Sequence, residues 1–270
     1  MKTWFITGTS RGFGREWTQA ALERGDRVAA TARNPDSLND LVQRFGDRIL
    51  PIRLNVTDRA ADFAAVKAAH EHFGQLDIIV NNAGYGLFGA IEEITESEAR
   101  EQIEANLFGA MWVTQAALPY LRAQGSGHIL QVSSISGIGA FPLLGLYNAS
   151  KWALEGFSEA LSQEVAPFGI SVTLIEPGKF DTDWSGNSAV HAAPIAAYDS
   201  FRTARAKQNT GNNSDPTASS AAILKLVDTE HPPLRLLLGK VAAQMVPQIY
   251  QRRLQVWAEW EDVSRAIDGE

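Results

Sequence analysis

The sequence predicts an α/β fold: one doubly wound parallel sheet of about seven strands, with helices on both faces. Short apolar segments alternate with helix-forming segments along most of the chain, which is the order typical of parallel sheets. The segment 76–80 is purely apolar after Asp77, as expected of a strand that is covered on both faces. A length of 270 residues and a hydrophobic content of 45% favour a single domain over residues 1–270.

The chain opens with a strand expected at 4–6 and a glycine-rich turn that contains Gly8, Gly12 and Gly14. The helix expected at 15–24 stops at Gly25, a residue typical of helix C-termini. Free N–H groups and the helix dipole make such a helix start a site for anions, of which a dinucleotide pyrophosphate is the usual example. The glycine spacing differs from the common dinucleotide fingerprint, so a turn that is glycine-rich only for tight packing remains an alternative.

The remaining elements follow from periodicity and from helix start and stop signals. Asp58 or Thr57 can cap one helix, which Gly74 ends, and the segment Thr95 to Glu98 predicts a capping box. Further strands are expected at 28–32, 49–54, 76–80, 128–133, 171–175 and 234–238. Further helices are expected at 37–45, 59–73, 98–124, 147–166, 216–228 and 244–267.

Two regions near the C-terminus stand apart from the regular alternation. The segment 181–215 is rich in Ala, Ser, Asn, Thr and Gly, and it predicts a mobile lid or a weakly ordered insertion. The last helix carries Leu254, Trp257 and Trp260, which we expect in the core.

Composition excludes several classes of function. A net charge of −7 argues against nucleic-acid binding, and the lack of cysteine excludes disulfides and thiolate metal sites. His70 and His72 have no partners suited to a metal, so no metal site is expected. No apolar run approaches the ~20 residues of a membrane span. Because the chain leads directly into its first strand, we expect no signal peptide and a cytoplasmic protein.

Tyr147 and Lys151 lie at positions i and i+4 of an expected helix and therefore share a face. A phenol has a reference pKa of about 10, and a nearby ammonium group is expected to lower that pKa. The pair alone is a weak signal, but Ser134 ends the preceding strand at the same crevice. These residues predict a proton donor and acceptor for catalysis.

With these motifs the chain resembles the short-chain dehydrogenase/reductase superfamily over about residues 2–240. The stretch 175–183 is similar to the branch that includes 17β-hydroxysteroid- and retinol-dehydrogenase-like enzymes. The resemblance implies a Rossmann-type sheet and hydride transfer between a secondary alcohol and a ketone or aldehyde. The matching motifs are Thr7-Gly8-x3-Gly12-x-Gly14, Asn81-Asn82-Ala83-Gly84, Tyr147-x3-Lys151 and Pro177-Gly178.

The resemblance also implies a role for each matching residue. Tyr147 would exchange a proton with the substrate oxygen, to which Ser134 would hydrogen-bond. Lys151 would hold the nicotinamide ribose, and Asn106 would support a water-linked proton path to it. Asn55 stands where the family often has an aspartate. The residues expected at the cofactor are Gly8, Ser10, Arg11, Gly12, Phe13, Gly14, Arg33, Asn55, Val56, Asn82, Ala83, Gly84, Tyr147, Lys151, Pro177, Gly178 and Thr182.

Charge favours NADP(H) over NAD(H). An NAD site usually has an acid at the end of the second strand, but this chain has Arg33 there and Arg11 inside the glycine turn. Two guanidinium groups suit a 2′-phosphate. If both arginines are ordinary surface charges, an NAD-dependent alcohol dehydrogenase of the same fold remains an alternative, as does a non-catalytic NADP-binding regulatory protein.

The substrate is expected to be a small, largely apolar carbonyl compound or alcohol. Trp184 and the segment 141–144 flank the expected substrate mouth and form either its wall or ordinary packing. The resemblance further implies a homodimer or homotetramer built through the helices at 98–124 and 147–166.

Overall fold

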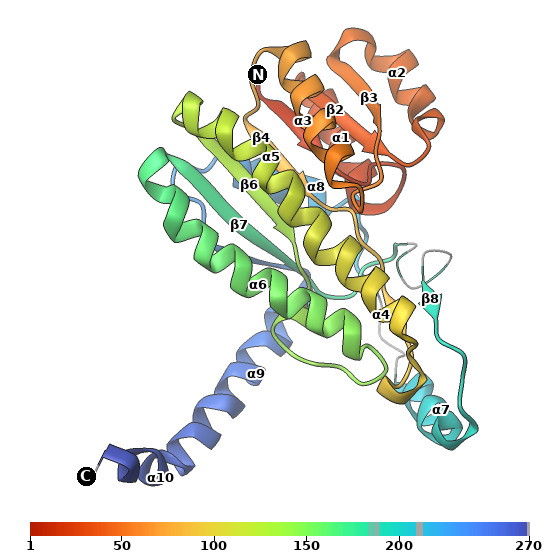
Figure 1. Ribbon diagram of the computed structural model, residues 1–270, viewed down its shortest axis with the longest axis vertical. Helices are drawn as coiled ribbons and strands as arrows, with labels where there is room; N and C mark the ends of the chain where they lie inside the picture. Colours follow the sequence, from red (N-terminus) through yellow and green to blue (C-terminus); the bar gives the residue numbers. More distant parts are fainter. Residues whose placement is uncertain (183, 185, 187–188, 209–212, 269–270) are drawn as a thin grey trace.

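Seven parallel strands form the main sheet of the computed structural model, which describes residues 1–182, 184, 186, 189–208 and 213–268. The strand order is β3-β2-β1-β4-β6-β7-β9, so the chain starts in the middle of the sheet and winds outward in both directions (Figure 1). This arrangement confirms the predicted fold class. The strands are β1 (Thr3–Ile6), β2 (Arg27–Ala32), β3 (Ile49–Arg53), β4 (Ile78–Asn81), β6 (Gly127–Val132), β7 (Ile170–Pro177) and β9 (Arg235–Leu238).

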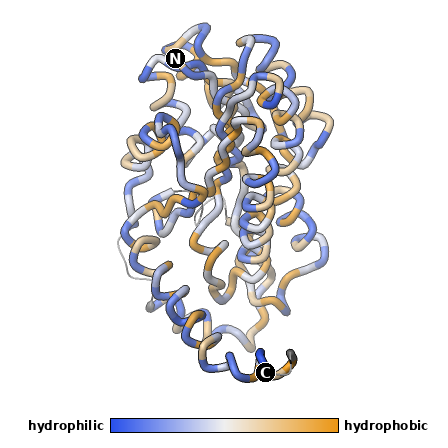
Figure 2. The backbone as a smooth tube through the Cα atoms, turned by 90° about the vertical axis from the view of Figure 1, so that its left-hand side faces the viewer, coloured by the Kyte–Doolittle hydropathy of each residue, from blue (hydrophilic) through white to orange (hydrophobic). Residues whose placement is uncertain are grey.

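Helices cover both faces of this sheet. Trp4 and Ile6 of β1 point into a core with α1 and α8, whereas Phe5 between them points into a second core with α3, α5 and α6. In Figure 2 the strands at the centre are largely hydrophobic, while the helices around them alternate in hydropathy. The helices are α1 (Gly12–Arg24), α2 (Asn39–Phe45), α3 (Arg59–Phe73), α4 (Glu96–Ile103), α5 (Gly109–Gln124), α6 (Gly145–Val165), α7 (Asp199–Gln208), α8 (Ser219–Val227), α9 (Lys240–Glu259) and α10 (Glu261–Arg265).

The helix expected at 98–124 is interrupted. A π-helical turn, η4 (Glu104–Phe108), separates α4 from α5, and the Thr95–Glu98 capping box opens α4 as predicted. The segment 181–215 contains β8 (Val190–His191), which pairs with β5 (Leu87–Phe88), and the helix α7. Residues 183, 185, 187–188 and 209–212 of this expected lid lie outside the described residues.

The expectation for the last helix is wrong. Leu254, Trp257 and Trp260 are 60%, 64% and 61% exposed, because only the first half of α9 packs on the domain. The second half and α10 extend away from the sheet (Figure 1). Helical spacing identified an apolar face here, but it did not indicate whether the domain extends far enough to cover that face.

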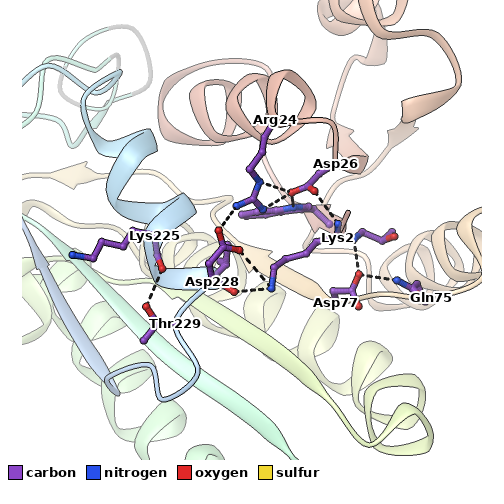
Figure 3. A network of polar contacts seen from close by, with 11 residues as sticks. Lys2, Arg24, Asp26, Gln75, Asp77, Lys225, Asp228 and Thr229 are labelled. Carbon is purple, nitrogen blue, oxygen red and sulfur yellow. Dashed lines mark hydrogen bonds and ion pairs between the residues drawn. The ribbon is translucent and has the colours of Figure 1, made fainter.

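A polar network fastens the start of the chain to α8 (Figure 3). The Lys2 ammonium donates to the Val227 carbonyl at 2.8 Å, and Arg24 pairs with both Asp26 and Asp228. Burial alone would raise the pKa of Asp26, but hydrogen bonds from the Lys2 backbone N–H, Arg24 and Trp4 outweigh that effect and lower the pKa. The first strand is thereby held at the centre of the sheet.

Asp62 in α3 is fully buried, and neither carboxylate oxygen has a hydrogen-bond partner among the described residues. Burial, together with the Asp58 charge, raises the pKa of Asp62 to about 8. Between about pH 4 and pH 8 the folded chain therefore keeps a proton that the unfolded chain loses. The free energy of unfolding should fall as pH rises through that window.

We therefore expect Asp62→Asn to raise the melting temperature more at pH 8 than at pH 5. The gain at pH 8 should be at least about 2–4 °C, the change that 1 kcal/mol gives in proteins of this size. Thermal unfolding followed by circular dichroism at the two pH values measures it. An equal rise in melting temperature at pH 5 and pH 8 would mean that Asp62 is already ionised in the folded chain at both values.

Across the described part of the chain, no helix is both long and apolar enough to cross a bilayer.

Candidate active site

A cavity of about 1700 Å³ lies at the carboxyl ends of the parallel strands. Loops that follow β1, β2, β3, β4, β6 and β7 line it, because parallel strands bring these ends to one edge of the sheet. All the predicted site residues line this cavity except Gly14 and Asn106. The structure therefore brings together residues that lie up to about 170 positions apart in the sequence.

The glycine turn forms a cradle that larger residues would obstruct. Gly8 and Gly12 have φ angles of +70° and +56°, which favour glycine. A Cβ atom on Gly14 would lie 2.3 Å from the Gly8 carbonyl oxygen, so Gly14 supports the turn from behind. The Asn82 amide donates to the carbonyl oxygens of Thr7 at 2.8 Å and Gly8 at 3.0 Å. Asn82 thus holds the turn in shape in addition to lining the cavity.

The turn leads directly into α1, whose N-cap residue Arg11 makes no side-chain capping hydrogen bond. The first N–H groups of a helix need partners from outside the helix, and an anion satisfies them. An uncapped helix start beside a close-packed glycine cradle fits the pyrophosphate of a dinucleotide.

Tyr147 and Lys151 lie on one face of α6, and both side chains are buried. Burial raises the pKa of Tyr147 to about 12, with a smaller opposing contribution from a hydrogen bond with Ser134. The prediction that Lys151 lowers the pKa of Tyr147 is therefore wrong for the chain by itself. The Lys151 ammonium donates to the Val132 carbonyl at 2.7 Å and lies 5.8 Å from the centre of the Tyr147 ring.

Ser134 follows β6 and faces Tyr147. Its hydroxyl oxygen accepts a hydrogen bond from the Ser136 N–H at 3.1 Å, so its own proton is left for Tyr147 or for a substrate oxygen.

Asn106 lies behind the cavity wall, in the π-helical turn η4. Its side chain exchanges hydrogen bonds with the Tyr85 backbone N–H and carbonyl, at 3.0 and 2.9 Å, and donates to the Ser150 hydroxyl at 3.2 Å. Ser150 in turn donates to the Tyr147 carbonyl at 2.7 Å. Asn106 therefore connects the loop after β4 with the helix that carries Tyr147. Sequence reasoning missed the π turn, since the hydrophobic periodicity continues through it.

A buried acidic pair lies behind Lys151, and the sequence analysis did not identify it. Arg235 of β9 contacts Glu155 at 3.1 Å and Glu176 at 3.4 Å. Burial raises the pKa of both carboxyls, that of Glu176 to about 8, so the two acids and one arginine retain a proton between them near neutral pH. Burial lowers the pKa of Lys151 to about 8, and the Glu155 charge opposes that shift. One feature of the sequence could have indicated this acidic pair: Glu155 lies one helical turn after Lys151 and so shares its face of α6.

Apolar side chains surround Tyr147 at one end of the cavity. The Trp184 ring lies 4.8 Å from the Tyr147 ring and 5.2 Å from the Phe88 ring, measured between centroids. Leu143 has a φ of +64°, an unusual conformation for a leucine. The apolar residues that line this end are Phe88, Phe141, Pro142, Leu143, Leu144, Trp184 and Met245.

Arg11 and Arg33 line the other end of the cavity, and both are exposed. The described lining residues from the ends of β1, β2 and β3 include no carboxylate. This end of the cavity therefore carries positive charge where a dinucleotide would place its adenosine.

The fold, the glycine cradle and the Ser134–Tyr147–Lys151 set, in which Tyr147 and Lys151 are buried and Ser134 is half-buried, define an oxidoreductase that uses a nicotinamide dinucleotide. The family model described as short chain dehydrogenase matches residues 2–192, and the chain belongs to this family.

Known proteins similar to this chain agree with that assignment. Oxidoreductase BOA17 of Botryotinia fuckeliana is 43% identical over 98% of both chains. The structure of a short-chain dehydrogenase from Streptomyces avermitilis is 39% identical, covers 99% of this chain and 100% of its own, and superposes with a TM-score of 0.92. An alcohol dehydrogenase from Thermococcus sibiricus, solved with 5-hydroxy-NADP, is 28% identical over 88% of this chain and 96% of its own, with a TM-score of 0.74.

Proposed function

We propose that this chain is an NADP(H)-dependent oxidoreductase that interconverts a largely apolar alcohol and the corresponding ketone or aldehyde. One observation carries the proposal: Ser134, Tyr147 and Lys151 share a single cavity with the glycine cradle and with two arginines. The apolar end lies at Tyr147, where a substrate oxygen would react, and the cationic end lies at the cradle.

In this proposal Tyr147 gives a proton to the substrate oxygen during reduction and takes one during oxidation. A pKa raised to about 12 keeps the phenol protonated at neutral pH, which suits a proton donor. Ser134 donates a hydrogen bond to the same oxygen, and Lys151 supplies a positive charge that stabilises the phenolate left behind. The nicotinamide, when bound, supplies or accepts the hydride.

The residues that would hold the cofactor follow from their positions around the cavity. The backbone of the glycine turn would bind the pyrophosphate, and Arg11 and Arg33 would bind the 2′-phosphate. Asn55 and Val56 would lie at the adenine. Pro177, Gly178 and Thr182 would lie at the nicotinamide. The alcohol dehydrogenase from Thermococcus sibiricus supports this choice, because its structure holds an NADP derivative.

The cofactor preference is tested by titrating NADPH and NADH while following tryptophan fluorescence, for which Trp184 in the cavity is a suitable reporter. We expect tighter binding of NADPH. Arg33→Asp should weaken it about 10- to 100-fold, which corresponds to a lost hydrogen bond between charged groups, and should leave NADH binding almost unchanged.

Arg122→Asp is a matched control, because Arg122 is exposed at the end of α5 and does not line the cavity. Preferential binding of NADH by the wild type would contradict the proposal and indicate an NAD-dependent enzyme. Turnover is then measured with NADPH and a panel of apolar ketones and aldehydes. Tight NADPH binding without turnover of any of them would favour the non-catalytic alternative.

A further inference from the structure

The C-terminal arm, defined here as residues 250–268, extends away from the rest of the molecule (Figure 1). Before it, Ala242 and Val246 of α9 pack in a small core with Ile135 and Ile138. Arg253 joins the arm to the domain by donating to the Ile138 carbonyl and by lying 4.8 Å over the Trp152 ring. The exposed large apolar side chains of the arm are Tyr250, Leu254, Val256, Trp257, Trp260, Val263 and Ile267.

The apolar face of α9 extends past the edge of the domain. Ala242, Val246 and Ile249 recur three or four residues apart, and beyond Arg253 the same spacing reaches Val256 and, just past the end of the helix, Trp260. A surface helix presents such a stripe to whatever covers it. The domain covers the first half of the stripe and leaves the second half uncovered.

The uncovered area is large for a monomer. The seven side chains together expose on the order of 700 Å², whereas a whole monomer typically has a largest apolar patch of roughly 300–600 Å² and a stable interface buries roughly 800 Å² per partner. The estimate exceeds the usual largest patch of a monomer and approaches the area that one partner buries in a stable interface.

A groove of about 420 Å³ lies beside the arm, between α9 and the loop that follows β6. Phe141 and Met245 line both this groove and the apolar end of the large cavity. The groove is lined by Gly139, Ala140, Phe141, Met245, Ile249, Arg252, Arg253, Val256 and Trp257.

We propose that the C-terminal arm binds a second copy of this chain, with the tip of each arm seated on the groove and arm of the partner. A two-fold pair needs both halves of the contact on one surface, and this chain has a protruding apolar stripe next to an apolar groove. A second copy seated here packs behind Phe141 and Met245, which form part of the wall at the substrate end. This surface differs from the helices at 98–124 and 147–166 through which assembly was expected.

Charge argues against a lipid surface as the occupant. Helices that lie on membranes carry an excess of Lys and Arg on their polar face. The arm has no such excess, because its three basic residues are outnumbered by four acidic ones: Arg252, Arg253 and Arg265 against Glu259, Glu261, Asp262 and Asp268. The arm is also part of the shared fold, since the Streptomyces avermitilis structure superposes on 99% of this chain.

Sedimentation velocity or light scattering of the full-length chain at micromolar concentration tests the proposal. We expect the Trp257→Glu/Trp260→Glu variant to show half the mass of the wild type. The dissociation constant of the dimer should rise at least about 30-fold, as for loss of a hot-spot residue. Circular dichroism should be unchanged, because neither tryptophan contributes to the core. Phe168→Ser, which removes an exposed aromatic side chain outside the arm, should keep the wild-type mass.

Three results would overturn the proposal. A wild type that remains monomeric at about 50 μM has no such interface, and a double variant with the wild-type mass assembles through another surface. Co-sedimentation of a monomeric wild type with phosphatidylcholine or phosphatidylserine vesicles, lost in the double variant, would identify a membrane as the occupant instead. If the double variant does not fold, Leu254→Gln and Val263→Gln together replace it under the same criteria.

Discussion

Replacing Tyr147 with phenylalanine is expected to lower kcat by at least about 10²- to 10⁴-fold, the range for loss of a general acid–base group. Reduction of a carbonyl leaves an alkoxide that needs a proton, and in the proposed mechanism the Tyr147 phenol supplies it. The ring stays in place because it packs against Trp184 at 4.8 Å. NADPH binding should therefore stay within about twofold of the wild type.

Steady-state rates with NADPH and an apolar ketone, together with the fluorescence titration, separate these two effects. Tyr85→Phe is the matched control, since Tyr85 also lines the cavity but its hydroxyl has no assigned part in proton transfer. It should change kcat by no more than a few fold. Retention of most of the activity in Tyr147→Phe would refute the assigned proton donor. Loss of NADPH binding in that variant would show that the substitution disturbs the cofactor site instead.

The second large effect is expected from Gly14→Ala. The new Cβ atom would lie 2.3 Å from the Gly8 carbonyl oxygen and 2.5 Å from the Asn82 amide nitrogen, far inside van der Waals contact. The first of these atoms belongs to the backbone of the turn, so relief requires the cradle itself to open. We expect a loss of about 1–3 kcal/mol in the free energy of unfolding, as for other overpacked sites, and loss of measurable NADPH binding.

Gly156→Ala is a matched control in α6, where a Cβ atom would meet nothing within 4 Å. Replacing a glycine inside a helix with alanine should raise the free energy of unfolding by roughly 0.5–1 kcal/mol and leave NADPH binding unchanged. Thermal unfolding and fluorescence titration of both variants give the comparison. If Gly14→Ala bound NADPH as the wild type does, the glycine turn would not be the pyrophosphate site.

The sequence alone predicted the seven strands of the main sheet, most of the helices and the edge of the sheet at which the cavity lies, but not α7 or the short strands β5 and β8. Both follow from local signals: periodicity separates strands from helices, and a parallel sheet brings the carboxyl ends of its strands to one edge. Gly8, Arg33 and Ser134, which follow three of these strands, could therefore be assigned to one crevice from the sequence, although their chemical roles stay predictions.

Tertiary structure decided the properties that depend on distant neighbours. Lys151 was expected to lower the pKa of Tyr147, but burial raises it. The acidic pair near Lys151 forms only because β7 and β9 bring Glu176 and Arg235 to Glu155. The exposure of Trp257 has the same origin. Helical spacing shows that a face is apolar, but the extent of the folded domain determines where that face stops being covered. The desolvation of a side chain and its ion pairs depend on every residue that lies near it in the folded chain, and a local sequence pattern does not specify those residues.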